Sequence, residues 1–220
     1  TGVQTCALPI SEHGRRRRGL YLITPECDDT PRLLELVRKV LEARPALLQY
    51  RSKLTDDSVR HEQALALAGL CREAGVALIV NDSVELALAV GADGVHLGRD
   101  DGDLGSARAR LGDDRIIGVS CYDEWTRARL AAEAGADYVA FGAVFGSATK
   151  PDAVHAPLSL VARAARALDV PVAAIGGITL DNVGVVRAAG ADLLCVISDV
   201  FTAADPAQRA GEFVRVLGDT

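Results

Sequence analysis

The sequence predicts a single (β/α)8 barrel, the TIM-barrel form of the α/β class, from three observations. Eight short apolar runs alternate with longer segments of helical pattern along the chain. The length of 220 residues lies near the lower end of the range for such barrels. No Gly-x-Gly-x-x-Gly turn follows an early strand, although a doubly wound sheet, which is the alternative architecture, usually carries one.

The predicted strands are short, rich in Val, Ile and Leu, and not strictly alternating. This pattern is typical of parallel strands that are covered on both faces. The eight strands are predicted at residues 20–24, 46–50, 76–80, 94–97, 116–119, 138–141, 172–175 and 193–197.

Capping signals define the segments between the strands. Thr30 followed by Pro31 predicts the N-cap and first turn of a helix that runs to about residue 43, and Thr55 predicts the N-cap of a second helix. Glycines follow four alanine-rich helix ends, where a positive φ can stop a helix; they are Gly75, Gly91, Gly135 and Gly190.

The tripeptide Gly-Ala-Asp occurs three times, each time between a predicted helix and the next strand, and ends in Asp93, Asp137 and Asp192. It forms a weak internal repeat of an αβ turn. Because turn chemistry alone accounts for aspartate at such positions, we expect these carboxylates to stabilise the N-terminal face of the barrel rather than to catalyse.

Composition excludes several classes of partner. The net charge of −6 offers no general basic field for nucleic acid, and no apolar run approaches the length of a transmembrane helix. The five cysteines are scattered without metal-binding spacing, which is typical of reduced thiols in a cytoplasmic protein. The sequence does not indicate an oligomeric state.

The first residues differ from the rest. We expect residues 1–19 to form a disordered or non-native tail and residues 20–220 to form the barrel. The basic run that ends at Arg18 precedes an apolar stretch too short for a signal peptide. Such a run is typical of a solvated tail, so neither nucleic acid nor membrane is an expected partner.

Polar side chains follow the predicted strands, at the end where barrels of this type place their active sites. Alternation sends Gln49, Arg51 and Lys53 to one side of the second strand end. Two neighbouring cations repel each other unless an anion lies between them. The residues alone leave two interpretations open, namely an anion site or solvated loop cations.

Two acidic dipeptides follow the third and fourth strands. They are Asn81-Asp82 and Asp100-Asp101, about one βα unit apart. Carboxylates at adjacent strand ends are hard oxygen ligands, which suit a Mg²⁺ ion that also holds a phosphate. His96, between the two dipeptides, is either an interior barrel residue or a substrate contact, and we favour a packed, hydrogen-bonded role.

The remaining strand ends predict two anion sites. A diphosphate would meet hydroxyls and cations, whereas a monophosphate would meet backbone N–H groups after strands seven and eight. No Ser-His-Asp set and no acid–base pair is evident, which favours substitution at an activated carbon over hydrolysis. The groups that follow strands five to eight are Ser120, Ser147, Thr149, Lys150, Gly177, Ile197 and Ser198.

With these motifs in this order, the chain resembles the thiamine phosphate synthase family from residue 20 to about residue 202. Each motif is modest alone, but their combination is highly specific. The matching segments are QYRSK at 49–53, NDSVELALAVGADGVHLGRDD at 81–101, IGVSCYD at 117–123, DYVAFGAVFGSATKPDA at 137–153 and AIGGITLDN at 174–182.

The resemblance implies a transferase that joins the two halves of thiamine. A hydroxymethylpyrimidine diphosphate would lose diphosphate in a Mg²⁺-dependent, dissociative step, and the ring nitrogen of a thiazole monophosphate would attack the methylene carbon. Both substrates are small molecules.

The resemblance also implies roles by position. Asp82 and Asp101 would bind Mg²⁺, and Asp100 would be a bystander. The pyrimidine diphosphate would contact Gln49, Arg51, Lys53, Asn81, Ser120 and Lys150, of which Arg51, Lys53, Ser120 and Lys150 would be catalytic. The thiazole phosphate would contact Ser147, Thr149, Gly177, Ile197 and Ser198.

The chain departs from the family pattern at two places. Arg99 stands where the family often has glutamine, and Ala148 interrupts the usual Ser-Pro-Thr-Lys or Thr-Pro-Thr-Lys loop. Neither change removes a group that the implied reaction needs.

Two alternatives use the same barrel. A thiazole tautomerase would need a histidine soon after the fifth strand, where this chain reads Ser120-Cys121-Tyr122-Asp123. A non-catalytic sensor of a phosphate ligand would more readily have lost Asp82, Asp101 or Lys150, and all three are present. The sequence therefore favours the synthase.

Overall fold

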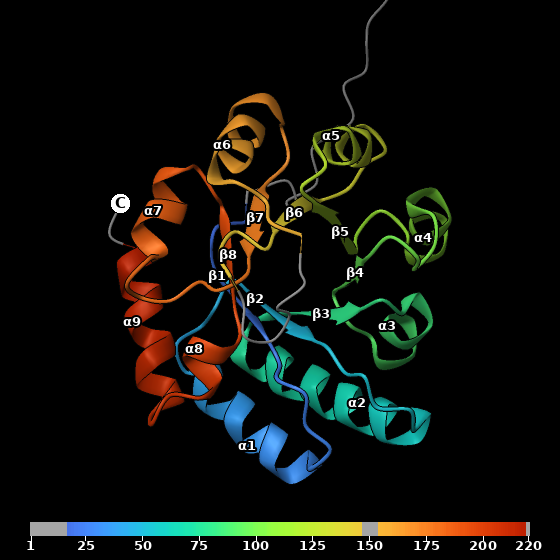
Figure 1. Cartoon of the computed structure of the whole chain (residues 1–220). Coiled ribbons are helices and arrows are strands. Elements are labelled where there is room, and N and C mark those ends of the chain that lie inside the picture. The colour runs from blue at the N-terminus through green and yellow to red at the C-terminus, as the bar shows by residue number, and fades with distance from the viewer. Residues whose placement is uncertain (1–16, 147–153, 219–220) are drawn as a thin grey trace, which may run out of the picture.

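The computed structural model describes residues 17–146 and 154–218, in which eight parallel strands close into a barrel with helices outside it (Figure 1). Each strand pairs with its neighbour in sequence, and β1 pairs with β8. This closure confirms the predicted TIM barrel and excludes the doubly wound sheet. The strands are β1 (Gly19–Ile23), β2 (Leu47–Tyr50), β3 (Ala77–Asn81), β4 (Gly94–Leu97), β5 (Ile116–Tyr122), β6 (Tyr138–Gly142), β7 (Val172–Ile175) and β8 (Leu193–Val196).

Helices separate successive strands and surround the barrel. The last two helices follow β8, and the longer of them, α9, packs beside α1 and β1. The helices are α1 (Thr30–Leu41), α2 (Asp57–Ala74), α3 (Val84–Val90), α4 (Leu104–Leu111), α5 (Trp125–Glu133), α6 (Leu158–Ala167), α7 (Val183–Ala188), α8 (Ser198–Phe201) and α9 (Pro206–Gly218).

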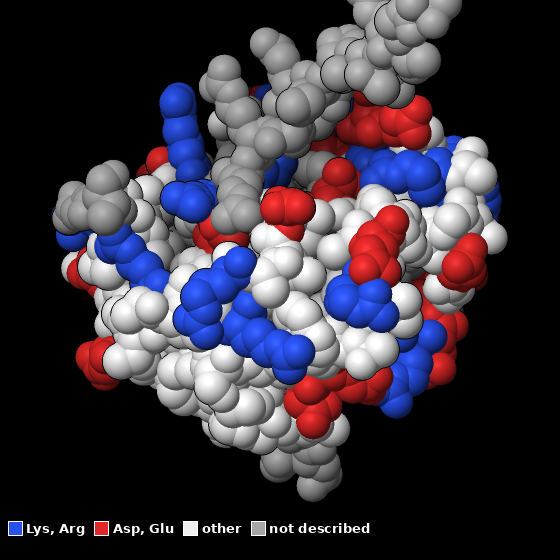
Figure 2. All heavy atoms as spheres, turned by 90° about the horizontal axis from the view of Figure 1, so that it is seen from above, with Lys and Arg blue, Asp and Glu red and all other residues white. Residues whose placement is uncertain are grey.

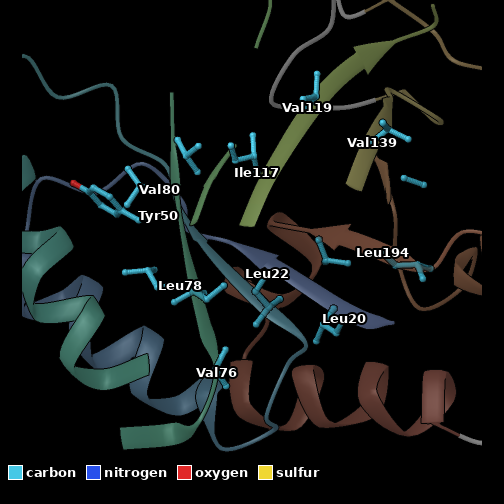
Figure 3. Close-up of a cluster of buried hydrophobic side chains, with 14 of the residues drawn as sticks. Leu20, Leu22, Tyr50, Val76, Leu78, Val80, Ile117, Val119, Val139 and Leu194 are labelled. Atoms are coloured by element: carbon cyan, nitrogen blue, oxygen red, sulfur yellow. The ribbon is translucent and has the colours of Figure 1, made fainter. Parts of the chain in front are cut away.

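Strand alternation divides the buried side chains into two cores. Outward-facing residues such as Leu20, Leu22 and Leu78 belong to a large cluster between the strands and the helices (Figure 3). Inward-facing residues such as Tyr21 and Tyr138 form a second, smaller cluster inside the barrel. The interior is therefore filled by side chains and is not an open pore.

The predicted strand positions are confirmed to within a few residues, but two predicted helix caps are wrong. Asp29, rather than Thr30, caps α1, and its carboxylate accepts from Arg32 N at 3.0 Å. Asp56, rather than Thr55, caps α2. In both cases a carboxylate next to the predicted threonine accepts the unpaired N–H groups, and its negative charge also suits the helix N-terminus.

The Gly-Ala-Asp repeat acts as predicted, as a structural turn. The carboxylates of Asp93, Asp137 and Asp192 each accept a backbone N–H of the preceding strand, at 2.8, 2.7 and 3.0 Å. Asp192 also pairs with Arg18 Nε at 2.9 Å, so the end of the basic run packs against the barrel. Residues 1–16 lie outside the described part of the chain.

The charged side chains are of mixed sign. On the face seen in Figure 2, Lys and Arg side chains lie beside Asp and Glu side chains. Within residues 17–146 and 154–218, no helix is long and apolar enough to cross a bilayer.

One glycine inside the barrel makes room for an aromatic ring. A Cβ atom on Gly118 would lie 1.9 Å from Cζ of Tyr138, far inside van der Waals contact. The two residues are partners in the β5–β6 register, so the smallest residue stands opposite one of the largest. The position of Tyr138 in the interior therefore depends on Gly118.

We predict that Gly118→Ala lowers the free energy of unfolding by about 1–3 kcal/mol, because the added methyl group must displace the Tyr138 ring. Urea denaturation followed by circular dichroism measures the change. Gly69→Ala is the matched control, since its Cβ would meet nothing within 4 Å and the site is a helix interior, where alanine stabilises by up to about 1 kcal/mol. Equal stability of the Gly118→Ala variant and the unaltered protein would contradict the account.

Candidate active site at the carboxyl end of the barrel

The end of β2 carries an amide and a cation that the sequence placed on one side. Gln49 points into the barrel and is 3% exposed. Arg51 follows it just beyond the strand and is half-buried. Thr24, at the end of β1, fixes the backbone here, because its hydroxyl accepts from Arg51 N at 3.0 Å and lies 3.2 Å from Arg51 O.

A carboxylate that sequence reasoning missed lies against the Arg51 guanidinium. Glu26, just after β1, accepts from Arg51 Nη1 at 2.9 Å and from Lys53 N at 2.8 Å. It therefore orients the loop that carries both cations and partly neutralises Arg51. An anion that binds Arg51 must share it with Glu26 or displace Glu26. The available signal was an acidic residue just after the first strand, one strand away from the Arg-Ser-Lys segment.

A chain of hydrogen bonds crosses the barrel interior beneath this mouth. Gln49 Nε2 lies 2.7 Å from Tyr21 Oη, which lies 2.7 Å from Tyr138 Oη. Tyr138 Oη lies 2.9 Å from His96 Nδ1, and His96 Nε2 lies 2.8 Å from Ser120 Oγ. The chain therefore links Gln49 to Ser120, the two candidate substrate contacts from β2 and β5.

Burial controls the protonation of this chain. It lowers the pKa of His96 from 6.5 to about 4, a shift that Asp101 opposes only in part, so the imidazole is neutral at pH 7. Burial also raises the pKa of Tyr21 and of Tyr138 well above the ordinary value, so both phenols keep their protons. The prediction that His96 is an interior, hydrogen-bonded residue is confirmed.

The acidic residues after β3 and β4 lie on adjacent strands. Asn81 pairs in register with His96, and Asp82 N donates to His96 O at 2.8 Å. Asp82 has a φ of 65°, an uncommon left-handed conformation for a residue other than glycine, which aspartate tolerates better than most residues. This turn ends β3 and places the Asp82 side chain at the carboxyl end of the barrel.

Asp101 is fixed by its own loop. Its Oδ2 atom accepts from Gly98 N at 2.7 Å, and a Cβ on Gly98 would lie 2.6 Å from that oxygen. Glycine at position 98 therefore lets the carboxylate fold back over the strand end. Asp100, in contrast, is exposed.

The Arg99 side chain is turned to other partners. It lies over the Tyr122 ring, 4.9 Å from the centroid, and pairs with Glu124. The extra cation next to the acidic loop is therefore already paired within the protein.

The two carboxylates form a small donor set. No group of three or more His, Cys, Asp or Glu side chains within the described ranges is placed to hold a metal. Magnesium often binds proteins through one or two carboxylates and takes its other ligands from phosphate and water. Asp82 and Asp101 fit that mode better than a site made entirely of protein ligands.

Arg127 is a second residue that sequence reasoning missed. From α5 it donates through Nε to Ser120 O at 2.7 Å and through Nη2 to Gly98 O at 2.9 Å. It thereby joins the ends of β4 and β5, the strands that carry the Asp101 loop and Ser120. Its position in the first turn of a helix gave no sequence signal.

The ends of β7 and β8 carry the candidate monophosphate residues. Gly177 has a φ of 61°, and a Cβ there would lie 2.5 Å from Gly146 O, so the loops after β6 and β7 approach closely. Asn182 Nδ2 donates to Gly177 O at 2.8 Å and fixes this turn. Ile197 and Ser198 lie where β8 passes into α8. Ser147, Thr149 and Lys150 lie outside the described residues.

We predict that buried His96 makes the fold sensitive to acid. The unfolded chain binds a proton below about pH 6.5, whereas the folded protein resists protonation down to about pH 4. The free energy of unfolding should therefore fall by roughly 3 kcal/mol as the pH falls through this window. Urea denaturation of the unaltered protein and of His96→Gln, at pH values from 7 to 4, isolates this contribution. Parallel stability curves would contradict it.

A family model and curated relatives in the comparison with known proteins indicate the same family. The family model for thiamine monophosphate synthase matches residues 20–200. The thiamine-phosphate synthase of Azoarcus sp. (strain BH72) is 66% identical over 197 residues, which cover 90% of this chain and 96% of that protein. The enzyme of the same name from Aromatoleum aromaticum is 64% identical, over 93% of this chain and 98% of that protein.

A similar solved structure carries a name that fits the same family. The thiamine phosphate pyrophosphorylase of Pyrococcus furiosus superposes with a TM-score of 0.82 at 34% identity, covering 93% of this chain and 97% of that one. A 3-hexulose-6-phosphate synthase, at 21% identity and a TM-score of 0.66, shares the fold. The match of the family model over most of the chain, together with the close relatives, shows that the chain belongs to the thiamine monophosphate synthase family.

Proposed function

We propose that this chain condenses a hydroxymethylpyrimidine diphosphate with a thiazole monophosphate to give thiamine phosphate and diphosphate. As a member of its family it is an enzyme of the transferase class. Its substrates are small molecules, and we place the reaction in the cytoplasm. The observation that carries the proposal is that cations follow β2 and carboxylates follow β3 and β4, three adjacent strands of the barrel.

These groups suit a diphosphate leaving group. Arg51 and Lys53 follow β2 and supply positive charge, while Asp82 and Asp101 follow β3 and β4 and suit a metal ion. When bound there, Mg²⁺ would neutralise the charge that develops on the departing diphosphate. A diphosphate with a bound metal ion needs cationic and carboxylate side chains together. Either kind alone would also fit a solvated loop.

The other residues complete the pyrimidine diphosphate site. Gln49 and Asn81 would orient the pyrimidine, because both are amides on inward-facing positions of β2 and β3. Ser120 would donate to the diphosphate from β5, and Lys150 would contact it from the loop after β6. Glu26 would release Arg51, in part, as the diphosphate binds.

The thiazole monophosphate would bind across the other side of the mouth. The backbone around Gly177, Ile197 and Ser198 would hold its phosphate, as the ends of strands seven and eight do in many barrels of this type. Ser147 and Thr149 would contact the same substrate. This arrangement would bring the thiazole nitrogen to the carbon that loses diphosphate, and positioning would supply much of the rate enhancement.

The chemistry of the site favours substitution over proton transfer. His96 is neutral, and both of its ring nitrogens are engaged inside the barrel, so it is poorly placed as a general base. This supports the synthase over the thiazole tautomerase. The curated relatives described above are named as thiamine-phosphate synthases, and neither the tautomerase nor the non-catalytic sensor is supported.

We predict that the purified protein forms thiamine phosphate from the two substrates in the presence of Mg²⁺. Chromatography of the product after timed incubation measures the activity. EDTA should abolish it, and added Mg²⁺ should restore it. A lack of product with Mg²⁺ present, from protein shown to be folded by circular dichroism, would refute the proposed function.

We predict that Asp101→Asn lowers kcat/KM by at least about a hundredfold, because a metal ion on a leaving group is worth several kcal/mol. Asp100→Asn is the matched control, since it removes the same charge from the exposed neighbour and should keep near-normal activity. Titration with Mg²⁺ should show weaker activation only for the first variant. Equal loss in both variants would show that Asp101 acts only through general charge.

A further inference from the structure

The hydrogen-bond chain inside the barrel can run in either of two directions, and the orientation of the Gln49 amide selects one of them. Within the described part of the chain, Tyr21 Oη has two hydrogen-bond partners, Gln49 Nε2 and Tyr138 Oη. An amide nitrogen only donates, so Tyr21 accepts from Gln49 and its own proton must point to Tyr138. Tyr138 thus accepts from Tyr21 and directs its proton to the remaining neighbour, His96 Nδ1.

The direction continues through the imidazole. A neutral histidine that accepts at Nδ1 carries its proton on Nε2. His96 Nε2 lies 2.8 Å from Ser120 Oγ, so it donates to the serine oxygen. The serine hydroxyl proton therefore does not take part in the hydrogen bond with His96. It is available to a group in the mouth of the barrel.

The opposite direction has opposite consequences at the mouth. It would need the Gln49 oxygen, rather than its nitrogen, against Tyr21, and the structure places Nε2 there. Every proton would then point the other way, and Ser120 would donate to His96. The serine would present only lone pairs to the mouth, which would repel an anion there.

We propose that Gln49, Tyr21, Tyr138 and His96 form a positioning chain that presents the Ser120 hydroxyl as a hydrogen-bond donor to the bound anion. Under the proposed function, on which this inference rests, that anion is the diphosphate of the pyrimidine substrate. Tyr21, Tyr138 and His96 are positioning residues, because they act through Ser120 and Gln49. The chain also couples its two ends. Gln49, which would orient the pyrimidine, sets the direction of the hydroxyl proton of Ser120, which would meet the diphosphate.

The room for this chain is built into the strands. Gly118 leaves space for the Tyr138 ring, as described above, and the Tyr21 and Tyr138 rings meet edge to face with centroids 5.8 Å apart. The His96 ring stacks on Tyr138 at 5.6 Å. These contacts hold the three rings in place, and the hydrogen-bond partners then set the direction of each proton.

The tautomer of His96 is the first test, and it does not require activity. Nitrogen-15 NMR of the uniformly labelled full chain distinguishes protonated from unprotonated ring nitrogens, and the loss of signals in His96→Gln assigns them. We expect the proton on Nε2 at pH 7. A proton on Nδ1 would overturn the proposed direction, whether or not the protein makes thiamine phosphate.

Kinetics of Tyr138→Phe provide the second test. This variant keeps the ring and removes the hydroxyl, so His96 Nδ1 loses its donor. We expect a mixture of His96 tautomers and a fall in kcat/KM for the pyrimidine diphosphate of at least about tenfold, as for the loss of one hydrogen bond to a charged group. The KM for the thiazole phosphate should not change.

Tyr50→Phe is the matched control. Tyr50 is also buried, and its hydroxyl lies 2.9 Å from Gln63 Oε1, but it faces outward from β2 and is not part of the chain. It should lose similar stability while keeping normal kinetics. Equal kinetic losses in the two variants, or normal kinetics in Tyr138→Phe, would overturn the coupling. If Tyr138→Phe does not fold, Tyr21→Phe takes its place with the same expected result.

Discussion

The hydrogen bond between Tyr21 and Tyr138 lies at the centre of the barrel, and the arrangement of its mouth depends on it. The two phenols are 1% and 2% exposed, and each lies next to a second polar group. A buried hydroxyl without a partner costs roughly 1–3 kcal/mol, so these groups are stable only as a connected set. The set extends to Gln49 and to His96, and through His96 it reaches Ser120. The interior is thus both a packing core and a polar support for the residues above it.

The two ends of the barrel have different tasks. At the amino end, the aspartates of the Gly-Ala-Asp repeat accept the N–H groups of neighbouring strands and hold the ring of strands together. At the carboxyl end, the carboxylates of Asp82 and Asp101 lie at turns that need unusual backbone or a nearby glycine. The same residue type therefore stabilises the fold at one end and, under the proposed function, binds Mg²⁺ at the other.

The fold could be predicted from the sequence because strand length, apolar content and helix–strand alternation are local properties. The positions of Gln49 within the end of a strand, and of Asp82 and Asp101 after strands, were also predictable, since parallel strands bring their carboxyl ends together. Glu26 and Arg127 could not be found in this way. Their contacts with Arg51 and with Ser120 O span 25 and 7 residues of sequence and depend on loop geometry.

The interior chain was hidden for a related reason. Tyr21 lies on β1 and Tyr138 on β6, so their rings meet edge to face only because the sheet closes and both point into the barrel interior. The caps show a smaller failure of the same kind. Thr30 and Thr55 are both suitable N-cap residues, but the aspartates next to them, Asp29 and Asp56, accept the N–H groups of the first turn instead.

Neutron diffraction from a deuterated crystal would show the direction of the interior chain, because it locates the exchangeable hydrogen positions between Gln49 and Ser120. We expect deuterium on Gln49 Nε2 toward Tyr21, on His96 Nε2 toward Ser120, and on Ser120 Oγ toward the mouth. Deuterium on His96 Nδ1, with the serine donating to His96, would contradict this direction. In that case Ser120 would present lone pairs to the mouth, and its assigned part in binding an anion would be wrong.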